Sequence, residues 1–368
     1  MQTQPEQHSQ AFKQKRTSED RGYNVILVST FVEQFNALLK GLENSTHQCV
    51  AVITREGGEA VADAAKESNL PVFSFPNCAN LQRLMDKDAA VAAQVHDAMQ
   101  VIEALDPDIL CCWGYQILPE CLIQLPKVNA LNFHFADLPK YRGGMSLAAQ
   151  IIEGEPETRL SLHELTVEVD AGMIMAKSEP IALPGLSSQA ILQKGINVAG
   201  KMLVDTLDQM LSNTLTPMPN DYQQPGLPHS WGVLRENITL EDGTTKRVNK
   251  GYLGYLAIHW DEDSCKHIER ACLGFDKLGG PYSCRDTLLV HFLNATQVNS
   301  LVTHQPGTIL EVTDENSILV QAQDGQLRCQ IFLNPQISKE ENPTLQTGDK
   351  LSKVISVSQL TGINDADR

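Results

Sequence analysis

Two polar residues stand at the end of an apolar run in the segment NFHFADLPKYRGG, residues 132–144. Asn132 and His134 are two positions apart, so in an extended strand their side chains point to the same face. An amide N–H can hold a developing oxyanion, and an imidazole can do the same or move a proton. Leu138-Pro139 and Gly143-Gly144 then end the strand and let backbone approach a ligand closely. Strand-end Asn and His residues often serve only a turn, so the pair by itself favours a site without establishing one.

A second polar segment, HELTVEVDAGMI, follows at residues 163–174. His163 and Asp170 flank an alternating stretch that reads as a strand and turns sharply at Gly172. If the two segments met, the Asp170 carboxylate would set the tautomer and charge of His134. Asn132, His134 and Asp170 are therefore the candidate catalytic residues, and His163 is interpreted as a wall of the site.

Short apolar strands alternate with helices in the part of the chain that carries these residues. This alternation predicts an α/β fold with a mostly parallel, doubly wound (Rossmann-like) sheet. Asn132 and His134 lie at the carboxyl end of a strand, where such sheets bind their ligands. No GxGxxG follows the first strand, so a dinucleotide site of the usual kind is not expected. The strands are predicted at 23–29, 49–54, 71–75, 108–114 and 129–134, and the helices at 32–42, 59–67, 81–105 and 188–211.

The C-terminal third differs in pattern from the part before it. A helix at 264–273 is followed by short alternating strands separated by turn signals, which predicts a small β-barrel. Three prolines at 214–227 mark a linker. We therefore predict a disordered tail at 1–21, a catalytic domain at 22–215, a linker at 216–250 and a barrel-like domain at 251–368.

Composition limits the classes of partner. The net charge of −16 disfavours a broad surface for nucleic acid, and DNA is not expected as a partner. No apolar run reaches the roughly 18–20 residues of a membrane span, and the N-terminus lacks the apolar core of a signal peptide. The nine cysteines include no CxxC pair, which predicts reduced thiols, a cytoplasmic location and no metal site.

The order of these motifs resembles the formyltransferase family that uses 10-formyltetrahydrofolate. That family includes glycinamide ribonucleotide, methionyl-tRNA and amino-sugar formyltransferases, and its pattern is Asn-x-His, Leu-Pro-x-Tyr-Arg-Gly, then Asp-x-Gly. The segment CWGYQILP, residues 112–119, is similar to its folate loop. The resemblance covers roughly residues 22–215, and a weaker one at 256–335 is similar to the C-terminal barrel of methionyl-tRNA formyltransferase. Ala136 and Arg159 depart from the usual pattern, but neither replaces one of the three polar residues.

The resemblance implies a co-substrate, 10-formyltetrahydrofolate, and a set of residues that bind it. These residues lie in two short segments, and backbone groups are expected to hold the pterin: Tyr115, Gln116, Ile117 and Leu118 in the first, and Thr166, Val167 and Val169 in the second. The expected activity is transfer of a one-carbon formyl group to a primary amine. The oxyanion of the tetrahedral intermediate would lie against Asn132 and His134, with Asp170 orienting His134.

The acceptor amine is less well determined by the sequence. A small amine, such as an amino sugar or an amino acid derivative, is preferred as the acceptor. The span between the second and third predicted strands is short, and it lacks the long basic insertion that resembles the tRNA-contacting loop of methionyl-tRNA formyltransferases. The segment 256–368 also holds 9 Lys and Arg against 15 Asp and Glu, which is a poor surface for a tRNA backbone. Three alternatives stay open: methionyl-tRNA formyltransferase, 10-formyltetrahydrofolate hydrolase, and a non-catalytic folate-binding module.

Overall fold

The computed structural model describes residues 22–78, 80–115, 117–221, 235–239, 245–249, 256–286, 288–314, 316–334 and 344–352. The chain forms two compact units, and neither is continuous in sequence. The first comprises residues up to 134 together with 160–178 and 195–224; the second comprises 135–159, 179–194 and the residues from 225 onward. The domain boundaries expected from the sequence, 22–215 and 251–368, remain a prediction.

A seven-stranded sheet forms the centre of the first unit, in the order β3-β2-β1-β4-β5-β7-β8. The strand pairs from β3 to β5 are parallel, and β8 runs antiparallel to β7. This confirms the predicted mostly parallel α/β fold. The strands are β1 (Asn24–Ser29), β2 (Gln48–Arg55), β3 (Val72–Phe75), β4 (Ile109–Trp113), β5 (Asn129–Phe135), β7 (Leu160–Glu164) and β8 (Ile174–Lys177).

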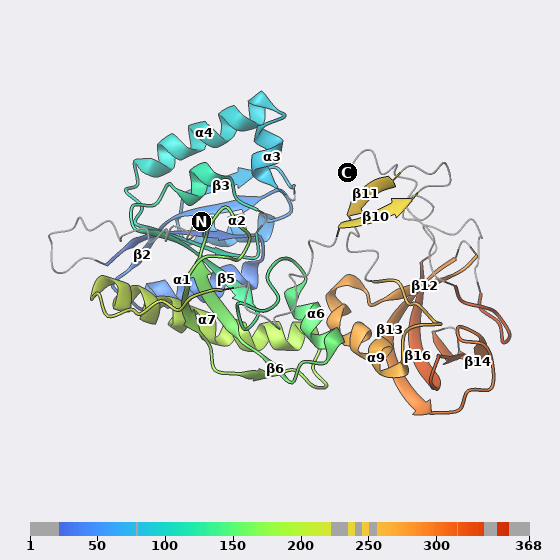
Figure 1. Ribbon diagram of the computed structural model, residues 1–368. Coiled ribbons are helices and arrows are strands. Elements are labelled where there is room, and N and C mark those ends of the chain that lie inside the picture. Colours follow the sequence, from blue (N-terminus) through green and yellow to red (C-terminus); the bar gives the residue numbers. More distant parts are fainter. Residues whose placement is uncertain are drawn as a thin grey trace, which may run out of the picture. The chain divides into compact units, whose positions relative to one another are not determined.

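Helices cover both faces of this sheet. Figure 1 shows α3 and α4 on one side and α1 and α7 on the other. Ile26 and Val28 of β1 belong to the apolar core with Leu81 of α3 and Val95 of α4. The helices are α1 (Val32–Glu43), α2 (Glu59–Glu67), α3 (Leu81–Met85), α4 (Ala89–Glu103), α5 (Glu120–Ile123) and α7 (Ser188–Leu211), the last of which continues from the second unit into the first.

Two helices occupy the stretch 81–105, for which the sequence predicts one. α3 ends at Met85 and α4 begins at Ala89. Asp88 is the N-cap of α4, because its carboxylate accepts hydrogen bonds from the backbone N–H groups of Ala90 and Val91. The first N–H groups of a helix have no partner within the helix, and a side-chain cap stabilises the helix by accepting from them. The cap at Asp88 therefore favours a new helix start between Met85 and Ala89.

The second unit contains an antiparallel sheet in the order β12-β13-β16-β15-β14. Its apolar interior includes Trp260, Phe292 and Ile318. Residues 350–352 pair with Cys284 of β12 and with Thr308 beside β14, and so connect the two edges of the sheet. This closure agrees with the small barrel expected from the sequence. The strands are β12 (Tyr282–Arg285), β13 (Leu288–Asn299), β14 (Ile309–Asp314), β15 (Ser317–Gln321) and β16 (Gln326–Asn334).

Two helices pack together beside the barrel strands. α6 (Ser146–Glu153) contacts α9 (Cys265–Gly274) through Ala148, Ile152 and Ala271. Ser264 caps α9 by accepting a hydrogen bond from the backbone N–H of His267. The remaining elements of this unit are the strands β6 (Glu157–Thr158), β9 (Ile181–Ala182), β10 (Arg235–Thr239) and β11 (Thr245–Asn249) and a 3₁₀ turn at Asp276–Leu278.

Two sequence expectations concern cysteines and membranes. All nine cysteines are unpaired thiols. Cys111 and Cys112 are both buried, and Cys112 alone of the two belongs to the core on the α3–α4 face, as alternation along a strand requires. Among the described residues, no helix combines the length and apolar character needed to cross a membrane.

A buried histidine makes the stability of the first unit depend on pH. The backbone N–H of Tyr23 donates to Nδ1 of His47 (2.9 Å), and Nε2 lies 3.1 Å from Oδ1 of Asp208. Burial lowers the pKa of His47, and the hydrogen bond and charge of Asp208 oppose that effect. The folded chain therefore favours the neutral ring, whose Nδ1 must stay an acceptor.

We expect the free energy of unfolding to fall as pH drops below about 6.5, because the unfolded ring then binds a proton more readily than the folded one. The contribution of His47 is complete above that pH and declines by at most about 1.4 kcal/mol per pH unit. Urea unfolding of wild type and His47→Gln at pH 7.5 and 5.5 checks this. Equal pH dependence in both proteins would rule out His47 as the cause.

Candidate active site

The candidate site lies at the carboxyl end of β5 and the turn between β7 and β8. Cys112 of β4 is the register partner of Asn132, so the site borders the ends of β4 and β5. His134 is two residues further along, at the edge of the sheet. The same topology that predicts ligand binding at this edge therefore brings Asn132 and His134 to it.

Asp170 is held by an unusual turn. Its φ of 48° lies in the left-handed region, which Asp tolerates better than most residues. The side-chain amide of Asn220 donates to the carbonyl oxygens of Asp170 (2.9 Å) and Gly172 (2.8 Å). A Cβ on Gly172 would lie 2.2 Å from the carbonyl oxygen of Glu164, so only glycine fits against β7 there. Asn220 has no sequence signal that would have identified it.

The Asp170 carboxylate lies between two histidines. Its Oδ2 is 3.4 Å from Nδ1 of His134, and its Oδ1 is 3.3 Å from Nε2 of His163. The two imidazole rings stand edge to face with centroids 6.3 Å apart. The side chain of His163 is completely buried, and those of His134 and Asp170 are about one-tenth exposed. An acceptor that receives one proton from each ring would hold both in place.

His163 also connects Asp170 to Asn132. Nε2 of His163 is 3.1 Å from Nδ2 of Asn132, and Nδ1 is 2.7 Å from the carbonyl oxygen of Glu164. A carbonyl cannot donate, so Nδ1 carries a proton. A neutral His163 ring then accepts from Asn132 through Nε2, whereas a protonated ring donates from Nε2 to Asp170. A proton added at Nε2 would therefore face Asp170 and would take away the acceptor of the Asn132 amide N–H.

The structure thus brings Asn132, His134 and Asp170 into one cluster, and it adds His163 as a full member. His163 is interpreted from the sequence as a wall of the site, and the structure shows both of its nitrogens in polar contacts. The signal was present in the sequence: His163 and Asp170 flank the same turn. The pairing of β7 beside β5, however, can only be seen in the fold. The catalytic roles of these residues remain a prediction.

No thiol at the site is suited to be a nucleophile. Burial first, and then the negative charge of Asp170, raise the pKa of the Cys112 thiol to about 12. The thiolate is the reactive form, so Cys112 is inert near neutral pH. Chemistry here rests on the amide, the imidazoles and the carboxylate.

The predicted folate-binding segments follow the two neighbours of β5 in the sheet. Residues 115–118 come after β4, and residues 166–169 come after β7. Ile117, Val167 and Val169 are exposed apolar side chains, with exposed fractions of 46%, 71% and 38%. The stretch 166–169 is a loop and not the continuation of a strand that its alternating pattern predicts. Gln116 lies outside the described residues.

Other members of the predicted set have structural partners. The Tyr115 hydroxyl donates to the carbonyl oxygen of Thr54 (3.1 Å), and the Leu118 side chain is buried in the core on the α3–α4 face. The Thr166 hydroxyl donates to the carbonyl oxygen of Glu168 (2.7 Å). The backbone carbonyl of Ile117 accepts from the N–H of Leu81. The side chains of Tyr115, Leu118 and Thr166 therefore hold the two segments in place. Contacts with a ligand would then be made by backbone groups and by the exposed apolar side chains.

The LPKYRGG loop belongs to the second unit and is held there by polar contacts. The Tyr141 hydroxyl lies 2.6 Å from Oε2 of Glu153 and 2.7 Å from Oε1 of Glu155. Burial and these two carboxylates raise the pKa of Tyr141. Ser146 Oγ and Gln150 Nε2 both donate to the carbonyl oxygen of Phe135. The loop is thus tied to α6.

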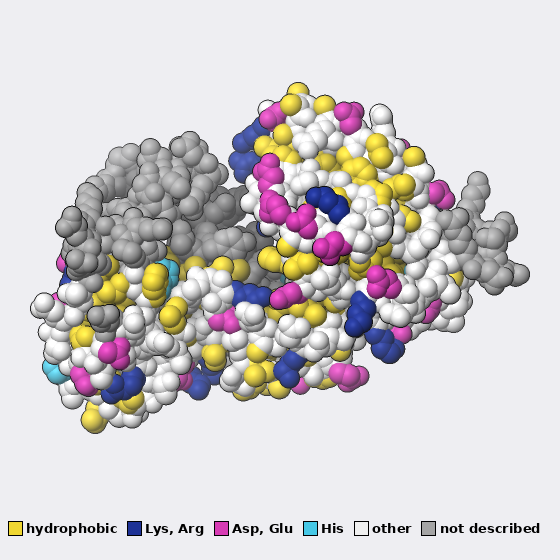
Figure 2. Space-filling view, turned by 180° about the vertical axis from the view of Figure 1, so that it is seen from behind, with side chains coloured by type: hydrophobic (Ala, Val, Ile, Leu, Met, Phe, Trp, Pro, Cys, Tyr) yellow, Lys and Arg dark blue, Asp and Glu magenta, His cyan; other side chains and the backbone are white. Residues whose placement is uncertain are grey.

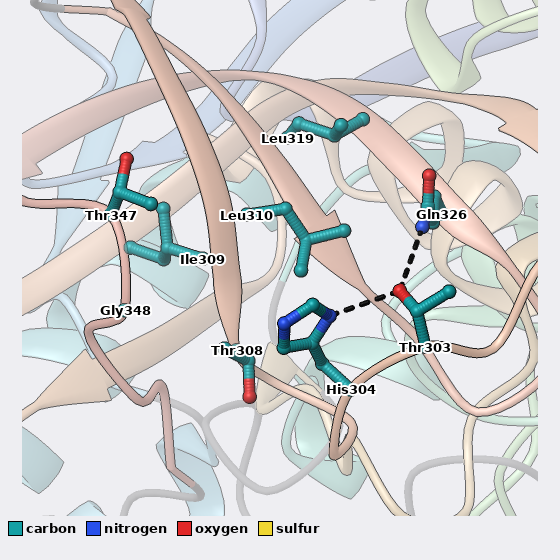
Figure 3. A pocket seen from close by; sticks show the side chains of 9 residues that line it. All are labelled: Thr303, His304, Thr308, Ile309, Leu310, Leu319, Gln326, Thr347 and Gly348. Atoms are coloured by element: carbon teal, nitrogen blue, oxygen red, sulfur yellow. Dashed lines mark hydrogen bonds between the residues drawn. The ribbon is translucent and has the colours of Figure 1, made fainter.

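A separate cavity of about 280 Å³ lies in the barrel (Figure 3). The Thr303 hydroxyl oxygen lies 2.9 Å from Nδ1 of His304 and accepts from Nε2 of Gln326 (3.3 Å). These polar groups satisfy one another, and none of the predicted site residues lines the cavity. Its lining is Thr303, His304, Thr308, Ile309, Leu310, Leu319, Gln326, Thr347 and Gly348.

Comparison with known proteins places this cluster in a family. The family model described as formyl transferase matches residues 24–207, which is half of the chain and includes the whole cluster. The chain belongs to the formyl transferase family. This confirms the resemblance seen in the motifs, and the family consists of enzymes that transfer formyl groups and use 10-formyltetrahydrofolate.

The relatives are methionyl-tRNA formyltransferases and structures of the same fold. The protein of that name from Enterococcus faecalis is 33% identical over 251 residues, which cover 64% of this chain and 73% of the relative. The one from Nitrosomonas eutropha is 25% identical over 225 residues, covering 61% and 64%. The chain thus spans about two thirds of the length of these curated relatives. The sugar 3N-formyl transferase WlaRD, solved with dTDP and 5-N-formyl-THF, has a TM-score of 0.53 at 13% identity, covering 85% of this chain and 98% of that one, and is alike in fold.

Proposed function

We propose that the protein transfers a formyl group from 10-formyltetrahydrofolate to the primary amine of a small molecule. The observation that supports this most is the cluster of Asn132, His134, His163 and Asp170 within the segment that matches the family. It combines hydrogen-bond donors for an oxyanion with a carboxylate that can accept and return a proton. Formation of an amide from an amine requires both functions.

The residues divide the chemistry between them. The neutral amine attacks the formyl carbon, a C–N bond forms, and the carbonyl oxygen becomes an oxyanion. The Asn132 amide N–H donates to that oxygen. His134 turns Nδ1–H toward Asp170, so it donates to the oxyanion through Nε2 only when the ring is protonated. Each such donor typically contributes about 10²–10³ in rate.

Proton transfers complete the reaction. The attacking nitrogen becomes an ammonium and gives its proton to the cluster of Asp170 and His163. The bond from the carbonyl carbon to N10 breaks, and N10 leaves with a proton supplied by His134. The products are a formamide and tetrahydrofolate, and the cluster returns to its starting proton count. Asp170 contacts both rings, which lets one carboxylate serve both transfers.

The co-substrate would lie over β5 between the two segments named above. Ile117, Val167 and Val169 expose apolar surface on either side of the strand, which suits a flat ring system. Backbone groups of residues 115–118 and 166–169 would supply its hydrogen bonds. We assign these segments to folate because they flank the cluster and expose apolar side chains beside it.

The direct test is a product analysis. The purified full chain is mixed with 10-formyltetrahydrofolate and a panel of primary amines, and formylated products and formate are quantified by mass spectrometry. A formamide that appears with one class of amine supports the proposal. Formate released at the same rate with and without amines would instead identify a hydrolase, and no turnover of any kind would leave a folate-binding module.

A second candidate acceptor is methionyl-tRNA, because the curated relatives carry that name. The face seen in Figure 2 offers little surface for it. In Figure 2, Lys and Arg side chains are interspersed with Asp and Glu on the face shown, without forming one continuous patch among the described residues. The chain as a whole carries −16.

We expect the purified protein to shift initiator tRNA weakly or not at all near 0.15 M salt, while it binds folate analogues. Each phosphate that a protein neutralises adds a salt dependence of about −0.9 in the logarithmic slope on duplex nucleic acid, and an acidic protein has few such contacts. Electrophoretic mobility shift over 0.05–0.3 M salt, with a basic tRNA-binding protein as positive control, checks this. Sub-micromolar binding with a steep salt slope would favour the methionyl-tRNA candidate.

A further inference from the structure

After α7 the chain returns to the central sheet in a short stretch, residues 217–221, called here the return segment. Met218 pairs antiparallel with Ile174 of β8, and each donates its backbone N–H to the carbonyl oxygen of the other (2.8 and 2.9 Å). On its other side β8 pairs with β7, where Ile174 is the register partner of His163. The return segment therefore covers the outer edge of β8, one strand away from a histidine of the site.

Asn220 is the residue of the return segment that contacts the turn at Asp170. Its Nδ2 donates to the carbonyl oxygens of Asp170 (2.9 Å) and Gly172 (2.8 Å), and an amide nitrogen carries one hydrogen for each. Its Oδ1 is buried and has no hydrogen-bond partner among the described residues. A buried acceptor without a donor destabilises a fold, so packing does not explain an amide here, whereas its two N–H groups do.

The turn has to be held from outside. The φ of Asp170, 48°, costs free energy for a residue with a side chain and persists only where the surroundings fix it. The carboxylate lies 3.4 Å from Nδ1 of His134 and 3.3 Å from Nε2 of His163, close to the upper limit of a hydrogen bond. A displacement of about 1 Å at a catalytic group can lower the rate about 100-fold. The position of this backbone turn therefore matters for the chemistry.

We propose that Asn220 is a positioning residue for formyl transfer. It acts through the backbone carbonyls of Asp170 and Gly172, and so keeps the Asp170 carboxylate between His134 and His163. The inference rests on the proposed function. Asn220 lies beyond residues 24–207, which match the family model, and within the last stretch of the first unit, residues 195–224. The end of that unit thus sets the geometry of its proton-transferring carboxylate.

The kinetic test compares three substitutions of asparagine. Asn220→Ala should lower kcat by about 10–100-fold, because the cluster stays complete but Asp170 is displaced. Asn220→Asp should be at least as damaging at neutral pH, because it keeps the size of the side chain but turns a negative charge and no donor toward the two carbonyls. The matched control is Asn44→Ala, which removes an amide that donates to the carbonyl oxygen of Lys40 (2.8 Å) and should keep the wild-type rate. A wild-type rate in Asn220→Asp would show that only size matters and would overturn the proposal.

A double variant shows whether Asn220 acts through Asp170. In the Asp170→Asn background, Asn220→Ala should lower kcat by no more than about 2-fold further, because residues that act as one unit have non-additive effects. A merely structural role would lower the rate by the same factor in both backgrounds. Equal factors would therefore overturn the proposal.

A last measurement does not depend on turnover. In the full chain labelled with ¹⁵N-histidine, the imidazole nitrogen signals of His134 and His163 report how each ring is hydrogen-bonded. Asn220→Ala should move both signals in the direction seen for Asp170→Asn, and Asn44→Ala should leave them in place. Unmoved signals in Asn220→Ala would overturn the proposal. If no amine is formylated by wild type but the signals move, the proposed function fails while the positioning of Asp170 by Asn220 stands.

Discussion

Alanine at Asn132 or at His134 is expected to lower kcat at least about 100-fold. Each substitution removes one hydrogen-bond donor to the oxyanion, and the loss of a single such donor typically costs about 10²–10³ in rate. Because the donors act mainly in the transition state, kcat and kcat/KM should fall together. Steady-state kinetics with 10-formyltetrahydrofolate and the preferred amine measure both constants.

Two controls separate a catalytic effect from a folding defect. His96→Ala changes an exposed histidine on α4 and should keep the wild-type rate. Circular dichroism and thermal unfolding should show the folded state for every variant, since His134 lies at the edge of the sheet rather than in its centre. Near-native turnover in either Asn132→Ala or His134→Ala would remove the oxyanion assignment for that residue.

Much of the central sheet could be predicted because its signals are local. The apolar runs from β1 to β5 and the amphipathic pattern of α1 carry their own periodicity, and α7 was predicted at 188–211, as observed. The break between α3 and α4 was missed because it depends on Asp88 capping a new helix. The helical spacing of apolar residues continues through Asp88, so this spacing alone predicts one longer helix at 81–105.

The candidate site was predictable in part for the same reason. Asn132 and His134 share a face of one strand, which alternation guarantees. The contacts of His163 with Asn132 and Asp170 depend on β7 lying beside β5, and on a left-handed turn at Asp170 held by the distant Asn220. The local sequence pattern predicts neither the position of β7 beside β5 nor the left-handed turn at Asp170. The alternating stretch 166–169 even suggests a strand where the chain forms a loop.

Asparagine at Asp170 should damage the enzyme as severely as loss of either donor, although it is nearly the same size. The carboxylate lies 3.4 Å from Nδ1 of His134 and 3.3 Å from Nε2 of His163, so one group contacts two rings. An amide offers one oxygen and one NH₂ group. Whichever ring faces the NH₂ group loses its acceptor, and neither ring then has a negative charge to stabilise its protonated form.

We therefore expect Asp170→Asn to lower kcat at least about 100-fold and to change the shape of the pH–rate profile. The left-handed turn should survive, because Asn tolerates that conformation as well as Asp does and Asn220 binds only backbone carbonyls there. Asp97→Asn, at an exposed position on α4, is the matched control and should leave both rate and profile unchanged. A low but pH-independent ratio of variant to wild-type rate would show that Asp170 only positions His134. An unchanged rate would mean that neither ring needs its charge during transfer.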